Sequence, residues 1–235
     1  MTLSADHELI AARTRVAAAS RELAAAGLVL GTAGNVSERV GDRVAITPTG
    51  ARLTELTPAH VTVVALDGSV LDGALAPTSE AALHLGVYAR HDARAVVHTH
   101  APLATALACV LDELPCVHYQ MLQLGGPVPV VPYFTFGSPE LAEATVAGLE
   151  GRQAVLMANH GAVTTGHDLA AAVENARLLE WACAVYWRAA SLGTPRVLGE
   201  AELAAVVETV VRRGYGTMRP ADDAIGAPAG TSRRS

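Results

Sequence analysis

Apolar residues recur every three or four positions along several segments, which is the spacing of one face of an α-helix. The first segment covers residues 6–26, and Gly27 follows it as a typical C-terminal cap. A second begins near Thr78 or Ser79, whose hydroxyls are good N-caps, and continues to about Arg90. The same spacing predicts further helices at residues 102–111, 139–149, 168–192 and 199–213.

Short apolar runs bounded by turn residues predict the strands. These runs cover residues 44–46, 61–64, 93–100, 117–119, 128–131 and 154–158. The region 28–70 is rich in glycine, and we expect it to consist of short strands joined by turns. Because predicted helices and strands alternate over the rest of the chain, the pattern favours an α/β fold.

The size and composition of the chain indicate one globular domain. At 235 residues, with 51% hydrophobic and 17% charged residues, it can bury a large core. We expect a domain over residues 1–219 and a mobile tail over residues 220–235. No apolar stretch is long enough to span a bilayer, so the sequence predicts a soluble cytoplasmic protein. The three cysteines lie in apolar runs and are expected in the core: Cys109, Cys116 and Cys183.

The charged residues argue against several classes of function. The net charge is −6, and the basic residues form no cluster larger than an arginine pair, so nucleic acid is not expected as a partner. All 17 basic residues are arginine. Without lysine the chain has no Schiff-base nucleophile, no anchor for pyridoxal phosphate and no Walker-type phosphate ligand. Carbonyl chemistry in this protein would therefore need a metal.

Three histidines are the candidates for binding that metal. His98 and His100 stand at the end of a predicted strand, where alternate side chains point to the same face. His160 follows another predicted strand directly before a glycine, so it can converge on the same edge of a sheet. A pair of histidines on a polar strand face is the plainer interpretation of His98 and His100. Three imidazoles with one open position would form a catalytic zinc site.

Glu80 is the candidate acid or base. A carboxylate in the first turn of a helix can be directed over the end of a neighbouring strand. Glutamate is also common at this position because it caps the helix or interacts with the helix dipole. Both interpretations of Glu80 remain open from its position alone.

Two glycine-rich turns, at residues 31–37 and 46–50, are candidate anion sites. Their backbone N–H groups, together with Asn, Thr and Ser side chains, can hold a phosphate without lysine. Thr78 and Ser79, near a predicted helix start, offer a third set of donors. Ordinary turn formation explains the same glycines. If the three segments meet near the histidines, they favour a phosphorylated substrate that chelates zinc.

These motifs, taken in order, resemble those of the class II aldolase and adducin family, and in particular the L-fuculose-phosphate aldolases. The resemblance extends from the first helix to about residue 219 and implies a three-layer α/β/α fold with a central, mostly antiparallel sheet. It also implies a homotetramer with active sites at subunit interfaces. The matching motifs are G-T-A-G-N-V-S (31–37), I-T-P-T-G (46–50), T-S-E (78–80), H-T-H-A (98–101), H-Y (118–119), P-Y-F-T-F-G (132–137), N-H-G (159–161) and R-G-Y-G (213–216).

The resemblance implies a role for each matching residue. His98, His100 and His160 are implied as ligands of one Zn²⁺ per subunit, although other divalent metals are possible. Glu80 is implied as the catalytic base that can also complete the zinc shell, and Tyr119 as the residue that reaches a neighbouring site and protonates the aldehyde oxygen. The residues implied to bind the phosphate or to shape the aldehyde pocket are Gly34, Asn35, Thr49, Gly50, Thr78, Ser79, Phe136 and Tyr215.

The activity implied by the resemblance is reversible cleavage of a small ketose 1-phosphate to dihydroxyacetone phosphate and a short aldehyde. L-Fuculose 1-phosphate, which yields L-lactaldehyde, is the first candidate, followed by 5-deoxyribulose 1-phosphate and rhamnulose 1-phosphate. Thr78 stands where the fuculose enzymes have serine, so the sugar stays open. The alternatives are a pentulose-phosphate 4-epimerase, which usually has aspartate in place of Glu80, and a methylthioribulose-phosphate dehydratase. A non-catalytic adducin-like interaction domain is a further alternative, which the intact histidine set argues against.

Overall fold

The structure is a computed structural model and describes residues 5–213. The chain divides into one compact unit that ends at Val197 and a second that starts at Leu198 and contains helix α6 (Glu200–Arg213). The predicted domain boundary at residue 219 and the predicted tail, 220–235, lie outside the described residues and stay predictions. Among the helices that the structure describes, none is long and apolar enough to cross a membrane.

Over residues 5–213, nine strands form one sheet in the order β4-β3-β2-β1-β5-β9-β8-β7-β6. Neighbouring strands are antiparallel except for the parallel pair β7 and β8, so the prediction of a mostly antiparallel sheet is confirmed. The strands are β1 (Asn35–Val40), β2 (Arg43–Ile46), β3 (Thr62–Ala65), β4 (Val70–Asp72), β5 (Ala95–Thr99), β6 (Glu113–Leu114), β7 (Val128–Val131), β8 (Ala154–Met157) and β9 (Gly161–Gly166).

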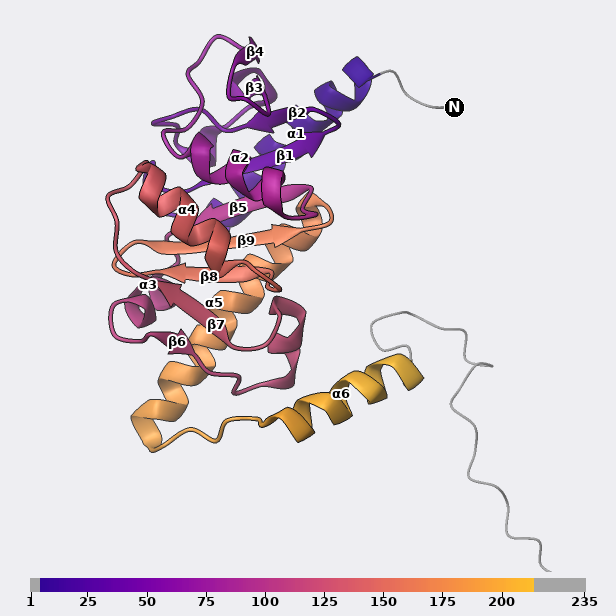
Figure 1. Cartoon of the computed structure of the whole chain (residues 1–235). Helices are drawn as coiled ribbons and strands as arrows, with labels where there is room; N and C mark the ends of the chain where they lie inside the picture. The colour runs from indigo at the N-terminus through magenta and orange to yellow at the C-terminus, as the bar shows by residue number, and fades with distance from the viewer. Residues whose placement is uncertain (1–4, 214–235) are drawn as a thin grey trace, which may run out of the picture. The chain divides into compact units, whose positions relative to one another are not determined.

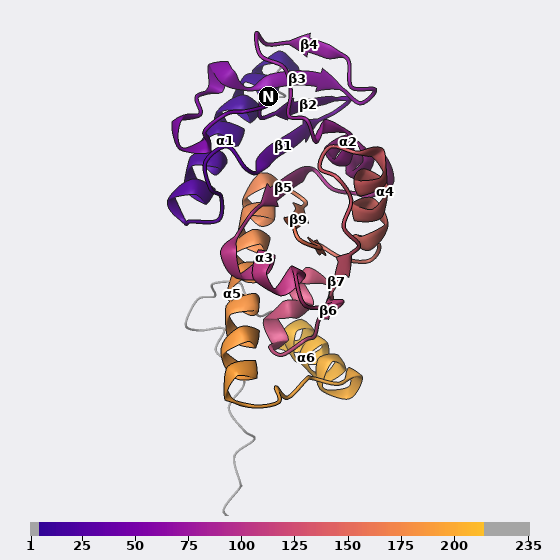
Figure 2. The same ribbon diagram turned by 90° about the vertical axis from the view of Figure 1, so that its left-hand side faces the viewer.

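Helices flank the sheet. Helices α2 and α4 lie side by side on one face, while α1 and α5 cover the other (Figures 1 and 2). A short 3₁₀-helix, η3, precedes β7. The bounds of these elements in the compact unit are α1 (Ala5–Ala25), α2 (Ala81–Arg90), α3 (Pro102–Ala108), α4 (Pro139–Gly148), α5 (Leu169–Leu192) and η3 (Tyr119–Leu124).

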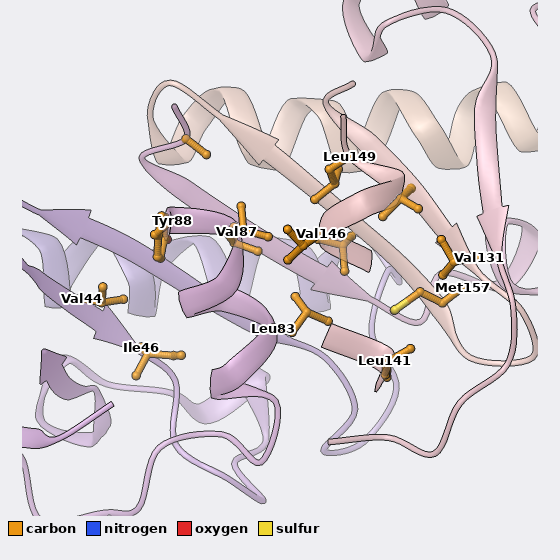
Figure 3. Close-up of a cluster of buried hydrophobic side chains, with 14 of the residues drawn as sticks. Val44, Ile46, Leu83, Val87, Tyr88, Val131, Leu141, Val146, Leu149 and Met157 are labelled. Carbon is orange, nitrogen blue, oxygen red and sulfur yellow. The ribbon is translucent and has the colours of Figure 1, made fainter. Parts of the chain in front are cut away.

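A buried apolar cluster fixes α2 and α4 against the sheet (Figure 3). Leu83 and Val87, one helical turn apart, both point inward from α2, and Leu141 and Val146 do so from α4. Full burial of one such side chain stabilises the fold by roughly 1.5–3 kcal/mol. Since α2 begins directly after Glu80, this packing also fixes the position of the candidate acid or base.

Four of the strands were not predicted by the apolar pattern: the short outer strands β4 and β6, and the strands β1 and β9 on either side of β5. Strand β1 contains Ser37, Glu38 and Arg39, which conceal its apolar alternation, yet most of it is buried between β2 and β5. Strand β9 is rich in glycine and threonine, and every residue of it is buried. Pairing with neighbouring strands, rather than local hydrophobicity, makes both segments strands.

Three other expectations from the sequence are wrong. The segment 117–119 is not a strand, because His118 caps η3 and its side chain accepts from the backbone N–H of Gln120. The N-cap of α2 is Glu80 rather than Thr78 or Ser79, since the loop before the helix is held by pairing with another loop. Cys109 is exposed because it caps the short helix α3, whereas the other two cysteines are buried.

The N-terminus of α3 is capped from another helix. Its N-cap is Ala101, which has no side-chain acceptor, and the carboxylate of Glu180 on α5 accepts from the backbone N–H groups of Leu103 (3.0 Å) and Ala104 (2.8 Å) instead. A carboxylate at this end of a helix also interacts favourably with its dipole. Glu180 therefore anchors the segment that directly follows His100.

Replacing Glu180 by Ala should lower the free energy of unfolding by about 1–2 kcal/mol, because two backbone donors lose their acceptor. Chemical denaturation of the purified variant measures the change. Glu174→Ala is a matched control on the same helix. The exposed carboxylate of Glu174 pairs with the partly exposed Arg177, so the change should stay below about 0.5 kcal/mol. Equal losses in the two variants would contradict the capping role.

Candidate active site

The pairing of β5 with β9 brings the three histidines together. His98 lies in β5 and His100 directly after it, while His160 lies in the turn between β8 and β9. The register pairs Thr99 with Ala162, which places the His160 turn beside the end of β5. Gly161 has to be glycine, because a Cβ there would lie 2.3 Å from the carbonyl oxygen of Thr99. The prediction that these three imidazoles converge at the ends of neighbouring strands is therefore confirmed.

The three imidazole rings face one another. Their centroids lie 4.8 Å apart for His98 and His100, and 4.9 Å apart for each of these with His160. One nitrogen of each ring lies within 4.8 Å of the others. Nδ1 of His98 donates to the carbonyl oxygen of Ala162 at 2.9 Å. This bond leaves the Nε2 lone pair of His98 directed into the group, as in histidines that bind metals.

Burial keeps two of these imidazoles neutral. Burial, with a smaller contribution from the neighbouring His98, lowers the pKa of His100 to about 4 and the pKa of His160 to about 4. At neutral pH both rings therefore present a free lone pair. Metal ligation by histidine requires the neutral ring.

Glu80 closes the group on its buried side. Its Oε2 lies 3.2 Å from Nε2 of His98, and its Oε1 lies 3.5 Å from Nε2 of His160. The amide Nδ2 of Asn35 donates to Oε2 at 2.8 Å. Burial raises the pKa of Glu80, but His98, Asn35 and His160 together outweigh it and hold the pKa well below its usual range. Glu80 is the N-cap residue of α2, but its side chain makes no hydrogen bond to the helix, so the interpretation of this carboxylate as a capping group is wrong.

The donor atoms of this group fit one metal ion. Neighbouring donors are separated by 3.0 Å (His98 Nε2 to His100 Nε2), 3.2 Å and 3.5 Å. Ligands about 2.0–2.1 Å from a tetrahedral ion lie about 3.3 Å from one another. Oε1 of Glu80 is buried and has no hydrogen-bond partner among the described residues. A cation would satisfy that oxygen and the converging imidazole lone pairs together.

The three candidate anion segments meet beside this group. The backbone N–H of Thr49 donates to Ala76, and that of Thr78 donates to Thr47, which joins the turn 46–50 to the segment before α2. Thr47 also exchanges backbone and side-chain hydrogen bonds with Val36 in β1. The strand pairing therefore places all three glycine- or hydroxyl-rich segments at the end of the sheet where Glu80 lies.

Within these segments the candidate phosphate residues differ in exposure. Thr49, Gly50 and Ser79 are exposed, while Asn35 and Thr78 are buried and hold the loop or the carboxylate. The Oγ1 of Thr78 accepts from the backbone N–H of Glu80 at 3.3 Å.

Gly34 is required by the site's geometry. It has a positive φ of 89°, and a Cβ there would lie 2.9 Å from the carbonyl oxygen of His98. A side chain at this position would therefore push the first turn away from the metal ligands. The phosphate-binding roles themselves stay predictions.

The other candidate residues lie at the periphery. Phe136 is exposed and precedes Gly137, which packs against the backbone of Ser79, the residue before Glu80. Tyr119 is partly exposed at the start of η3, and its ring packs on that of His118. Tyr215 lies outside the described residues. The roles predicted for these three side chains stay predictions.

The sequence reasoning missed two buried polar residues behind Glu80, His84 and Tyr88, and treated a third, Ser37, only as part of a candidate anion turn. His84 on α2, Ser37 on β1 and Tyr88 on α2 are almost completely inaccessible to solvent. His84 lies one helical turn after Glu80, on the inward face of α2. One feature of the sequence could have identified His84. It is a histidine on the apolar face of a predicted helix, four residues after a candidate catalytic carboxylate.

Comparisons with known proteins show the family to which this chain belongs. A sequence model described as the class II aldolase and adducin N-terminal domain matches residues 14–187. A 5-methylthioribulose-1-phosphate/5-deoxyribulose-1-phosphate aldolase of Rhodospirillum rubrum is 37% identical over 92% of this chain and 98% of its own length. The L-fuculose phosphate aldolase of Escherichia coli K12 is 37% identical over 80% of this chain and 88% of its own.

A solved structure of an L-fuculose 1-phosphate aldolase superposes with a TM-score of 0.82 and 33% identity, covering 90% of this chain and 98% of that one. The family match extends from the middle of α1 almost to the end of α5, and so includes all four residues of the histidine and Glu80 group. This chain belongs to the class II aldolase and adducin family.

Proposed function

We propose that this protein is a zinc-dependent aldolase that reversibly cleaves a ketose 1-phosphate into dihydroxyacetone phosphate and a short aldehyde. The observation that carries the proposal is the contact of a buried, ionised Glu80 with His98 and His160. A carboxylate beside a metal site is suited to moving a proton next to a carbonyl that the metal polarises. The names of the relatives support the same reaction class.

In this proposal the residues of the site have distinct tasks. A zinc ion held by the three histidines would act as a Lewis acid and stabilise negative charge on the substrate's carbonyl oxygen. In the direction of synthesis, Glu80 takes the proton from C3 of dihydroxyacetone phosphate as the new carbon–carbon bond forms there. Asn35 holds that carboxylate in position. Cleavage is the reverse, and Glu80 then returns the proton to C3.

The aldehyde oxygen needs its own proton donor, and we propose Tyr119. Its phenol lies partly exposed at the start of η3. The side chain of Phe136 is more exposed, and aromatic side chains are enriched at subunit interfaces. We therefore propose a homotetramer in which Tyr119 serves a neighbouring site and Phe136 shapes the aldehyde pocket.

For the substrate we favour a 5-deoxypentulose 1-phosphate over L-fuculose 1-phosphate. The relative named for 5-deoxyribulose 1-phosphate matches 92% of this chain, and the one named for fuculose phosphate matches 80%, at equal identity. Cleavage between C3 and C4 gives dihydroxyacetone phosphate from either sugar. The other product is acetaldehyde from the pentulose and L-lactaldehyde from fuculose, so the aldehyde identifies the substrate.

The protein loaded with zinc should condense dihydroxyacetone phosphate with acetaldehyde to a 5-deoxypentulose 1-phosphate, identified by mass spectrometry and NMR. L-Lactaldehyde and glycolaldehyde should react with a lower kcat/KM. A higher kcat/KM with L-lactaldehyde would make fuculose 1-phosphate the better substrate. If no ketose phosphate formed with any aldehyde, the aldolase proposal would be wrong. Epimerisation of a pentulose phosphate at C4 without release of free aldehyde would support an epimerase instead.

A further inference from the structure

A chain of buried hydrogen bonds runs from Glu80 into the core behind the site. The side-chain amide of Asn35 contacts Oε2 of Glu80 through Nδ2 and Nε2 of His84 through Oδ1. Nδ1 of His84 lies 2.7 Å from Oγ of Ser37, which lies 2.7 Å from the hydroxyl of Tyr88. None of these five side chains is more than 8% exposed.

The donor and acceptor of each bond follow from the geometry of the Asn35 amide. Its Nδ2 donates to Oε2 of Glu80, so the carbonyl Oδ1 of the same amide faces His84. Oδ1 can only accept, so Nε2 of His84 carries a hydrogen. If His84 is neutral, its Nδ1 is then a bare acceptor, to which the hydroxyl of Ser37 donates.

The last bond of the chain completes the assignment. With its own hydrogen given to His84, the oxygen of Ser37 accepts from the hydroxyl of Tyr88. Burial lowers the pKa of His84 to about 3, so the ring is neutral at physiological pH. Burial also raises the pKa of Tyr88 well above its usual range, so the phenol keeps the hydrogen that it donates.

We propose that His84, Ser37 and Tyr88 are positioning residues that lock the Asn35 amide with both N–H hydrogens turned toward the active site. One hydrogen holds the carboxylate of Glu80. The second is left for an oxygen of the bound substrate. An amide rotated by 180° would direct its oxygen at the carboxylate, and His84 prevents this because its N–H needs the same oxygen.

This inference rests on the proposed function for its effect on catalysis, but the state of His84 can be tested without activity. Nitrogen NMR of the zinc-loaded protein, labelled with ¹⁵N at histidine, distinguishes a protonated from a bare ring nitrogen. The signals of His84 are those absent from His84→Gln. The expected result is a hydrogen on Nε2 and none on Nδ1. A hydrogen on Nδ1 only, or on both nitrogens, overturns the proposal.

Two further variants test the order of the bonds. Ser37→Ala removes the donor to Nδ1 of His84, so the nitrogen signal of Nδ1 should shift toward that of a bare nitrogen that accepts no hydrogen bond. The hydrogen should stay on Nε2, because Oδ1 of Asn35 still accepts it. Tyr88→Phe is the matched control, because the hydroxyl of Ser37 remains and the Nδ1 signal should change less. An unchanged Nδ1 signal in Ser37→Ala, or an equal shift in Tyr88→Phe, contradicts the assigned directions.

Steady-state kinetics then measure how much the fixed orientation of the Asn35 amide contributes to catalysis. His84→Leu removes the donor to Asn35 and should lower kcat/KM by about 10- to 100-fold, as for other residues that orient catalytic groups. His84→Gln can still donate near the position of Nε2 and should recover most of that loss. Zinc content and the unfolding temperature of each variant separate this effect from loss of metal or fold. Equal losses in His84→Leu and His84→Gln would contradict the proposal.

The two proposals can fail separately. If the wild-type protein makes no ketose phosphate, the aldolase assignment is wrong, and the NMR tautomer of His84 still decides whether the Asn35 amide is locked. If the wild-type protein is an active aldolase and His84→Leu retains full kcat/KM, the aldolase assignment holds and the positioning role is wrong.

Discussion

Glu80→Gln is expected to lower kcat by about 10²- to 10⁴-fold, the range for loss of a general acid or base. Glutamine has nearly the same shape but cannot take the proton from C3 of dihydroxyacetone phosphate. Its carbonyl oxygen can still accept from Nδ2 of Asn35, so the surrounding hydrogen bonds should survive. Steady-state kinetics of aldol synthesis measure the change, and proton exchange at C3, followed by NMR in deuterium oxide, should slow with it.

The Glu80→Gln variant should keep its metal, because the three histidines remain. Glu38→Gln is the matched control. Glu38 is a second largely buried carboxylate, also on an element beside the site, but it pairs with Arg15 rather than with a histidine. Its loss should affect stability and leave kcat nearly unchanged. Full aldolase activity in Glu80→Gln with zinc bound would refute the proton-transfer role.

His160→Ala is expected to abolish stoichiometric zinc binding and to lower activity by about 10³-fold or more. Loss of the Lewis acid removes several kcal/mol of transition-state stabilisation, and about 4 kcal/mol corresponds to a thousandfold in rate. Removal of this ring also takes away the imidazole that lies 3.5 Å from Oε1 of Glu80. Elemental analysis by mass spectrometry gives the zinc content, and initial rates give the activity.

His167→Ala is the control for that experiment. His167 is exposed, seven residues from His160, and contacts Asp168 on the surface. The His167→Ala variant should retain the full zinc content and the full rate of aldol synthesis. Treatment of the wild-type protein with a chelator should reproduce the His160→Ala loss, and added zinc should reverse it only in the wild type. An active His160→Ala variant free of zinc would overturn the metal proposal.

The prediction of the candidate site succeeded where local chemistry is specific. His98 and His100 share a face because strand side chains alternate, so their convergence needed no knowledge of the rest of the fold. His160 was found because it precedes a glycine at the end of an apolar run. Gly161 is needed there since the backbone of Thr99 lies against it, and no other residue has room.

The prediction failed where neighbouring strands supply what the local sequence lacks. Strand β1 was not predicted because its central residues are polar, and it forms because β2 and β5 pair with it on both sides. The segment 117–119 looked like a strand but is followed by a 3₁₀-helix that His118 caps. Thr78 and Ser79 looked like helix caps, whereas Thr78 pairs with Thr47 and leaves Glu80 as the last residue before α2.

The sequence by itself determined the family, the histidine group and the α/β composition of the fold, because each depends on motifs or periodicities within short segments. Only the tertiary structure decided what Glu80 does. Its carboxylate meets His98, His160 and Asn35 because β1, β5 and the β8–β9 turn are brought together by sheet pairing across more than a hundred residues of sequence. The buried role of His84 was likewise decided by packing, since hydrogen-bond direction depends on partners that are distant along the chain.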